Sequence, residues 1–104
     1  MAELFRVAAD DPCLDGHFPG DPIVPAVVIL DAVVVACERR AVGRVEAIER
    51  CRFRAPLHPE RSCRIELGAV DHGSVRFRCV VAETEIARGR LRVKGAQEAR
   101  DSLD

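Results

Sequence analysis

An alternation of apolar and polar residues runs through the second half of the chain, and this period of two constrains the fold more than any other feature. Successive side chains of a β-strand point to opposite faces, so the pattern predicts strands with one buried face. The turn signal Asp71-His72-Gly73 predicts a hairpin between two of them. The predicted inward residues are Val45, Ala47, Cys51 and Phe53; Cys63, Ile65, Leu67 and Ala69; Val75, Phe77, Cys79 and Val81; and Leu91 and Val93 in the segment 86–94.

One long apolar segment, residues 26–40, precedes these strands. Its length without a turn signal favours a helix, although the β-branched run Val33–Val35 also fits a strand. Pro25 stands where a first-turn proline is tolerated, two arginines suit the negative end of the helix dipole, and Gly43 ends the helix. Apolar residues cover nearly every face, which predicts that the helix is buried.

The order of elements is therefore an edge strand at Leu4–Ala8, a buried helix and four antiparallel strands. This order predicts an α+β fold in which one curved antiparallel sheet wraps around a central helix. We expect a single domain over residues 1–104, with a frayed polar tail at 95–104. One copy leaves an edge strand and much apolar helix uncovered, so we expect a dimer that pairs sheets edge to edge.

The composition excludes several functional classes. Hydrophobic residues make up 48% and charged residues 32% of the chain, which is typical of a globular protein. A formal charge of −1 disfavours nucleic-acid binding by phosphate neutralisation. The apolar stretch 23–37 is too short to span a bilayer. The five cysteines form no CxxC pair and no signal peptide is visible, so we expect no metal site, no redox pair and a cytoplasmic location.

Two residues near the start of the predicted helix indicate chemistry. His17 lies in a loop rich in proline and glycine, and Asp31 lies in the second helical turn among apolar neighbours. Burial would favour the neutral form of such a carboxyl group, and a neutral acid beside a histidine is a candidate pair for general acid–base catalysis. The residues alone leave alternatives open: the histidine could form loop hydrogen bonds, and the aspartate could face solvent or cap a loop.

The string from Gly16 to Asp31 resembles the signature of the 3-hydroxyacyl-ACP dehydratases, which are hotdog-fold enzymes of fatty-acid synthesis. Their pattern is approximately G-H-F-x-G-x-P-x-M-P-G, followed by a helix with Glu or Asp fourteen residues after the histidine, which is the spacing of His17 and Asp31. The aspartate is most similar to the branch that also isomerises the double bond, and the short length is similar to compact dehydratase-like proteins of aryl-polyene pathways. The matching residues are Gly16, His17, Phe18, Gly20, Pro22, Pro25 and Asp31.

The resemblance implies a hotdog fold and a 3-hydroxyacyl thioester substrate. The thioester would be carried on the phosphopantetheine of an acyl carrier protein, or on coenzyme A, with no metal and no other cofactor. The active unit would be a homodimer, with higher oligomers left open, and three arginines at the helix end could receive an acidic carrier: Arg39, Arg40 and Arg44. The implied catalytic residues are His17 and Asp31, and the implied substrate-binding residues are Phe18, Gly20, Pro25 and Ala26.

Ala26 departs from the pattern, because the family has a glycine after the second proline. Its N–H, at the helix start, would donate to the thioester carbonyl oxygen. Alanine keeps this donor and adds a methyl group where the substrate passes. Two alternatives stay open beside the dehydratase: a hotdog acyl thioesterase, and a non-catalytic acyl-binding or regulatory subunit.

Overall fold

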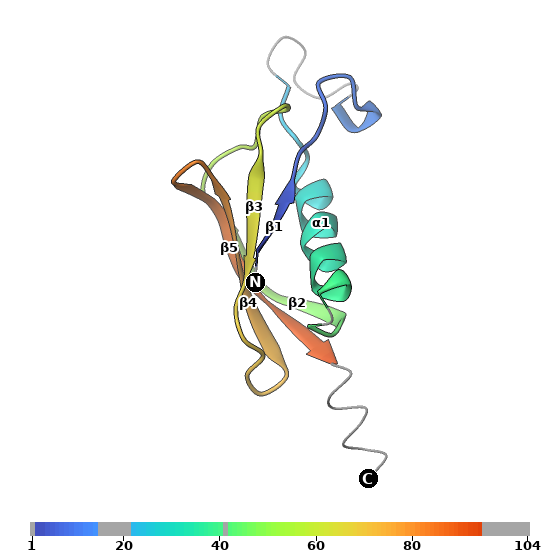
Figure 1. Ribbon diagram of the computed structural model, residues 1–104, viewed down its shortest axis with the longest axis vertical. Coiled ribbons are helices and arrows are strands. Elements are labelled where there is room, and N and C mark those ends of the chain that lie inside the picture. Colours follow the sequence, from blue (N-terminus) through green and yellow to red (C-terminus); the bar gives the residue numbers. More distant parts are fainter. Residues whose placement is uncertain (1, 15–21, 41, 95–104) are drawn as a thin grey trace.

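The structure, a computed structural model, describes residues 2–14, 22–40 and 42–94. The elements are β1 (Ala2–Phe5), a short 3₁₀ helix (Pro12–Leu14), α1 (Ala26–Arg39), β2 (Arg44–Phe53), β3 (Cys63–Leu67), β4 (Ser74–Val81) and β5 (Thr84–Lys94). The strands form one antiparallel sheet in the order β1-β3-β4-β5-β2, and α1 lies along one face of it (Figure 1). The predicted order of one strand, one helix and four antiparallel strands is confirmed.

The core lies between α1 and the face of the sheet that α1 covers, which we call the inner face. Alternate residues of β3, β4 and β5 point into it, as the period of two predicts. Ala69 departs from this pattern because it lies beyond the end of β3 and is exposed. A register shift after Cys79 also interrupts the alternation in β4, where Val80 is buried and the predicted inward Val81 is half-buried. Each buried aliphatic or aromatic side chain contributes about 1.5–3 kcal/mol, so this layer is the main stabilising contact. Its members include Ile29, Val33, Ala36, Cys37, Cys63, Ile65, Leu67, Val75, Phe77, Cys79, Leu91 and Val93.

The hairpin between β3 and β4 turns where the sequence predicts it. His72 and Gly73 have φ angles of 52° and 75°. The backbone groups of Asp71 and Ser74 exchange two hydrogen bonds of 2.8 and 3.0 Å around them. Two consecutive positive φ angles are typical of the tight turns that match the twist of antiparallel strands.

Strand β2 departs from strict alternation. Its register against β5 shifts between Val45 and Ala47 and again after Ile48. Each shift changes the face that the following residues take. Ala47, which was predicted inward, therefore pairs with the exposed Arg92, whereas Ile48 pairs with the buried Leu91. The prediction for Ala47 is wrong because a strict period of two does not allow for an extra residue.

Helix α1 is buried on one side only, which corrects the prediction of a helix buried all round. Val27 and Val35 are 70% and 39% exposed, and Asp31 between them is exposed as well. These three residues are spaced by four and share one stripe of the helix. The sheet of a single chain covers only the opposite side of α1, so an apolar stripe around one carboxylate stays open to solvent.

The two edges of the sheet differ in length. β1 is confirmed as an edge strand, although it runs from Ala2 to Phe5 rather than from Leu4 to Ala8. The other edge is the ten-residue β2, on which Ile48 is 46% and Phe53 is 39% exposed. A long unpaired edge with exposed apolar side chains is a template for pairing with another strand.

Candidate active site

The start of α1 is fixed by contacts with the loop that follows β2. The Val24 N–H donates a hydrogen bond of 2.8 Å to the Leu57 carbonyl, and both side chains are buried. Pro25 stands at the N-cap, where its carbonyl accepts bonds from two N–H groups of the first turn. Ala26 is thus the first helical residue. Its N–H has no acceptor within the helix and lies at the positive end of the helix dipole.

Asp31 lies one and a half turns further along α1, on its open stripe. None of the ion pairs among the described residues includes Asp31. The sequence leaves two possibilities for this carboxylate, enclosure by apolar residues or exposure to solvent. In the single chain it is exposed, between Val27 and Val35. Enclosure of this carboxylate therefore depends on a surface that one chain does not provide.

The remaining predicted site residues divide between described and undescribed parts of the chain. Pro25 and Ala26 lie at the start of α1, as expected. His17, Phe18 and Gly20 lie outside the described residues. The arrangement of His17 relative to Asp31 therefore stays a prediction.

The surroundings of three of the five cysteines disfavour the thiolate form: Cys37, Cys51 and Cys79. All five are free thiols, and three of them are buried. Burial raises the pKa of Cys37 to about 11 and also raises the pKa of Cys51. A hydrogen bond with Cys63, together with burial, raises the pKa of Cys79. A thiol with a raised pKa stays protonated at neutral pH and is a poor nucleophile or metal ligand.

The described residues contain neither a cluster of metal ligands nor a membrane-spanning helix. Within residues 2–14, 22–40 and 42–94, no three His, Cys, Asp or Glu side chains are grouped to hold a metal ion. The one α-helix in this part of the chain is not long and apolar enough to cross a membrane.

The arginines at the end of α1 are occupied by an acidic partner within the chain. Arg39 and Arg40 contact the Glu3 carboxylate of β1 at 2.8 and 3.2 Å. Arg40 also donates to the Ala2 carbonyl at 2.9 Å. These contacts hold the end of the helix against the edge strand β1.

A second basic region was missed by sequence reasoning. A hollow of about 810 Å³ lies on the face of the sheet opposite to α1, which we call the outer face. The signal was present in the sequence as arginines at alternate positions of three strands, but only the strand pairing brings them together. Seven arginines line this hollow: Arg50, Arg52, Arg54, Arg76, Arg78, Arg88 and Arg90.

Comparison with models of known protein families shows the family to which the chain belongs. The model of the ApeI-like family, described as ApeI dehydratase, matches residues 2–90. The chain belongs to the ApeI-like dehydratase family. The matched range includes the loop with His17 and the whole of α1.

Curated relatives of this ApeI-like chain are 3-hydroxyacyl-[acyl-carrier-protein] dehydratases named FabZ. The protein of Granulibacter bethesdensis is 35% identical over 114 aligned positions, which cover 90% of this chain and 67% of that protein. The protein of Geotalea uraniireducens is 31% identical over 78, covering 64% of this chain and 54% of that protein. The protein of Haemophilus influenzae is 35% identical over 69, covering 57% and 47%. The chain thus spans about half the length of the Geotalea and Haemophilus proteins and about two thirds of the Granulibacter protein.

Solved structures confirm the hotdog fold. The dehydratase heterocomplex ApeI:P from Xenorhabdus doucetiae aligns with a TM-score of 0.75 at 20% identity, over 88% of this chain and 84% of that one. An uncharacterised protein from Erwinia carotovora gives 0.75 at 23% identity, over 93% and 84%. A gentisyl-coenzyme A thioesterase gives 0.65 at 20% identity, over 89% and 88%. One fold thus supports both elimination and hydrolysis, so the function has to be argued from the site.

Proposed function

We propose that this ApeI-like chain is a dehydratase that removes water from a 3-hydroxyacyl thioester carried on the phosphopantetheine of an acyl carrier protein. The observation that supports this most is the family match over residues 2–90, which includes the His17 string and Asp31. The product is a trans-2-enoyl thioester. The chemistry is proton transfer with electrostatic stabilisation and requires no redox step.

The proposed roles follow the order in which charge moves. His17 takes a proton from C2 of the acyl chain, and the electron pair of that bond forms the C2–C3 double bond. Asp31, as the neutral acid, gives its proton to the departing 3-hydroxyl, directly or through a water, so that water leaves. The Ala26 N–H donates to the thioester oxygen while negative charge develops on it. Transfer of the proton from His17 back to Asp31 restores the starting state.

A homodimer completes this site. The open stripe of α1 and the unpaired edge of β2 both expose apolar side chains, among them Val27 and Ile48. Pairing of two β2 edges would continue the sheet and cover both surfaces. It would also enclose Asp31, which favours the neutral acid that the mechanism requires. We propose that His17 of one protomer works with Asp31 of its partner.

Substitution of the two catalytic residues tests the reaction. The purified chain is given a 3-hydroxyacyl thioester, and formation of the enoyl thioester is followed by mass spectrometry. We expect His17→Ala and Asp31→Asn each to lower turnover by about 10²–10⁴-fold. His72→Ala and Asp71→Asn, which alter exposed residues of the β3–β4 hairpin, are the matched controls. Equal rates in all five proteins would refute the assignment, and release of free thiol in place of enoyl product would identify a thioesterase.

Mixing the two inactive variants tests the shared site. A heterodimer of His17→Ala and Asp31→Asn chains has one site with both residues intact and one with neither. Random assortment makes about half of the dimers mixed, so activity should recover to about a quarter of the wild-type value. If each site used both residues from the same protomer, mixing would restore nothing.

A further inference from the structure

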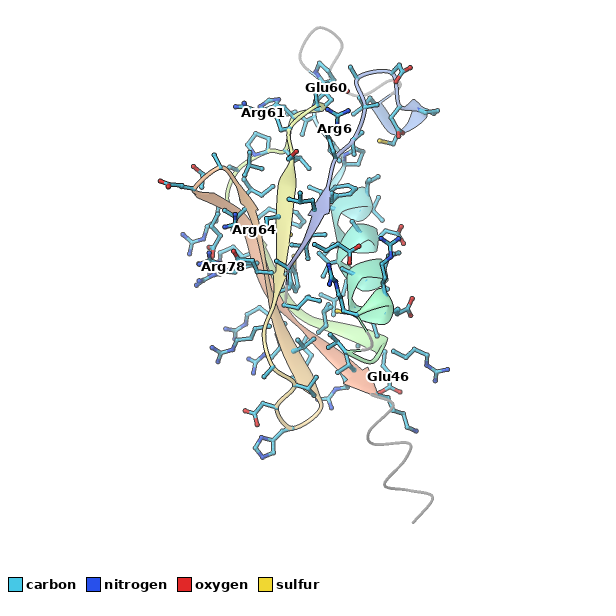
Figure 2. The ribbon with its side chains drawn as sticks, in the orientation of Figure 1. Arg6, Glu46, Glu60, Arg61, Arg64 and Arg78 are labelled. Carbon is cyan, nitrogen blue, oxygen red and sulfur yellow. The ribbon has the colours of Figure 1, made fainter. Side chains whose placement is uncertain are left out.

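The outer face of the sheet carries a grid of arginines whose order is set by strand register. In β2, β5 and β4, arginines stand directly opposite one another, and side chains of directly paired residues share a face. One row is Arg50, Arg90 and Arg76, and the next row is Arg52, Arg88 and Arg78. We call these two rows the arginine grid. Figure 2 shows Arg78, with Arg64 on the neighbouring strand, on the side of the sheet away from α1.

The two rows differ in how far carboxylates neutralise them. In the second row, Arg88 contacts Glu85 at 3.1 Å and Arg78 contacts Glu66 at 3.1 Å. No ion pair joins a member of the first row to any carboxylate in the described ranges. Three guanidinium groups without an ion-pair contact to a described carboxylate therefore lie across two strand spacings, which is roughly 10 Å. The charge of Arg90 also contributes to lowering the pKa of the Glu49 carboxyl.

Folding does not account for this grid. Like charges directly opposite each other destabilise a sheet, and any mixture of polar residues would keep the outer face soluble. The net charge of the chain is −1, so the grid is a local concentration of positive charge rather than a reflection of a basic protein. Such a surface attracts anions and speeds their encounter with the protein.

The shape and composition of the region favour one class of partner. Sites for small molecules are concave and mostly apolar, whereas this hollow has charged walls. The aromatic among its lining residues, Phe77, is buried on the inner face and offers no surface for stacking nucleic-acid bases. A second copy would bring arginines against arginines. Arginine is enriched at protein interfaces because its planar fork binds carboxylates in pairs.

We propose that the arginine grid, centred on Arg50, Arg76 and Arg90, is the docking surface for an acidic protein. The surface lies on the face of the sheet that α1 does not cover, so this proposal is independent of the dehydratase reaction. Carboxylates of the partner would neutralise the first row and relieve the repulsion along it. The complex should therefore weaken steeply as salt is added.

Binding of fluorescein-labelled poly-L-glutamate, followed by fluorescence anisotropy, tests this proposal. We expect the row variant R50Q/R76Q/R90Q to bind at least about tenfold more weakly than the wild type. The control variant R6Q/R61Q/K94Q removes the same charge at exposed positions outside the arginine grid and should weaken binding less than about twofold. Circular dichroism establishes that each variant is folded, and Arg90→Gln alone is used if the triple variant is not.

Three results would overturn the proposal. The first is equal loss of binding in the row variant and in the control variant R6Q/R61Q/K94Q, which would reduce the effect to net charge. The second is wild-type binding by the row variant, or by Arg90→Gln where that variant is used. The third is tighter, row-dependent binding of duplex DNA or of vesicles rich in an anionic lipid than of poly-L-glutamate, which would assign the grid to a nucleic acid or a membrane.

Discussion

The two faces of the sheet are built by the same strands, but their side chains affect the stability of the sheet in opposite directions. On the inner face, Phe77 of β4 lies opposite Gly89 of β5, and the pair packs into the core under α1. One residue away, Arg76 lies opposite Arg90 on the outer face. The inner pairs are dictated by packing, whereas the arginine–arginine pairs of the outer face oppose the stability of the sheet. This difference indicates that the inner face determines the fold and that the outer face is available for a function that folding does not require.

The sharpest test of this contrast compares adjacent residues of β4. Phe77→Ala removes a ring that is 2% exposed and should lower the free energy of unfolding by about 3–5 kcal/mol. Arg76→Ala, its neighbour on the outer face, should change it by less than about 0.5 kcal/mol. Urea denaturation followed by circular dichroism measures both. Similar losses in the two variants would mean that the outer face also carries the fold.

A second test uses the close approach at Gly89. A Cβ atom at this position would lie 2.7 Å from the Phe77 ring and would also meet the Arg50 carbonyl oxygen. Gly89→Ala should therefore cost about 1–3 kcal/mol, as overpacking does. Gly68→Ala is the control, because the nearest atom to its Cβ would be 3.6 Å away. A neutral Gly89→Ala in the same urea titration would show that the Phe77 ring and the β2 backbone at Arg50 both have room to move.

The inner face could be predicted from the sequence, and the grid could not. Alternation along each strand identifies Ile65, Phe77 and Leu91 as core residues without knowledge of which strands pair. The grid exists only through register, since Arg90 meets Arg50 and Arg76 once β2, β5 and β4 are aligned. Alternation also fails at Ala47, where a bulge adds a residue.

For the candidate site, the sequence predicted the start of α1 and the place of Asp31 on it. It left open whether Asp31 is enclosed or exposed, because a helix that is apolar all round gives no sign of which side the sheet of its own chain covers. Val27 and Val33 are both valines in one helix, yet one is 70% exposed and the other fully buried. Only the tertiary arrangement separates them.

A third test asks whether the first row of the grid destabilises the sheet. Arg90 stands between Arg50 and Arg76, so Arg90→Gln should raise the free energy of unfolding by about 0.2–1 kcal/mol. The gain should shrink as salt screens the repulsion. Arg92→Gln, two residues along the same strand, removes a 2.8 Å contact with Glu49 and should give no gain. Equal gains from the two variants would contradict repulsion within the row.

The smallest expected effect concerns the second row of the arginine grid, in which Arg78 and Arg88 contact carboxylates. The hydrogen bond from Arg64, together with the nearby Arg78, lowers the pKa of Glu66 below its ordinary value of 4.5. A carboxylate with a lowered folded-state pKa stabilises the protein above the ordinary value, and this contribution is lost as pH falls through the lowered value. Glu66→Gln removes the contribution at neutral pH, so the stability difference between wild type and variant should shrink between about pH 5 and pH 3.

Thermal unfolding across this pH range measures that difference. Glu83→Gln is the control, because Glu83 is an exposed carboxylate in the β4–β5 turn and forms no ion pair with a described residue. A difference that stays constant with pH for Glu66→Gln, as it should for Glu83→Gln, would mean that the carboxylate charge of Glu66 contributes nothing to the outer face. Neutralisation of the second row by described carboxylates would then depend on Glu85, which contacts Arg88 at 3.1 Å and Arg78 at 3.7 Å.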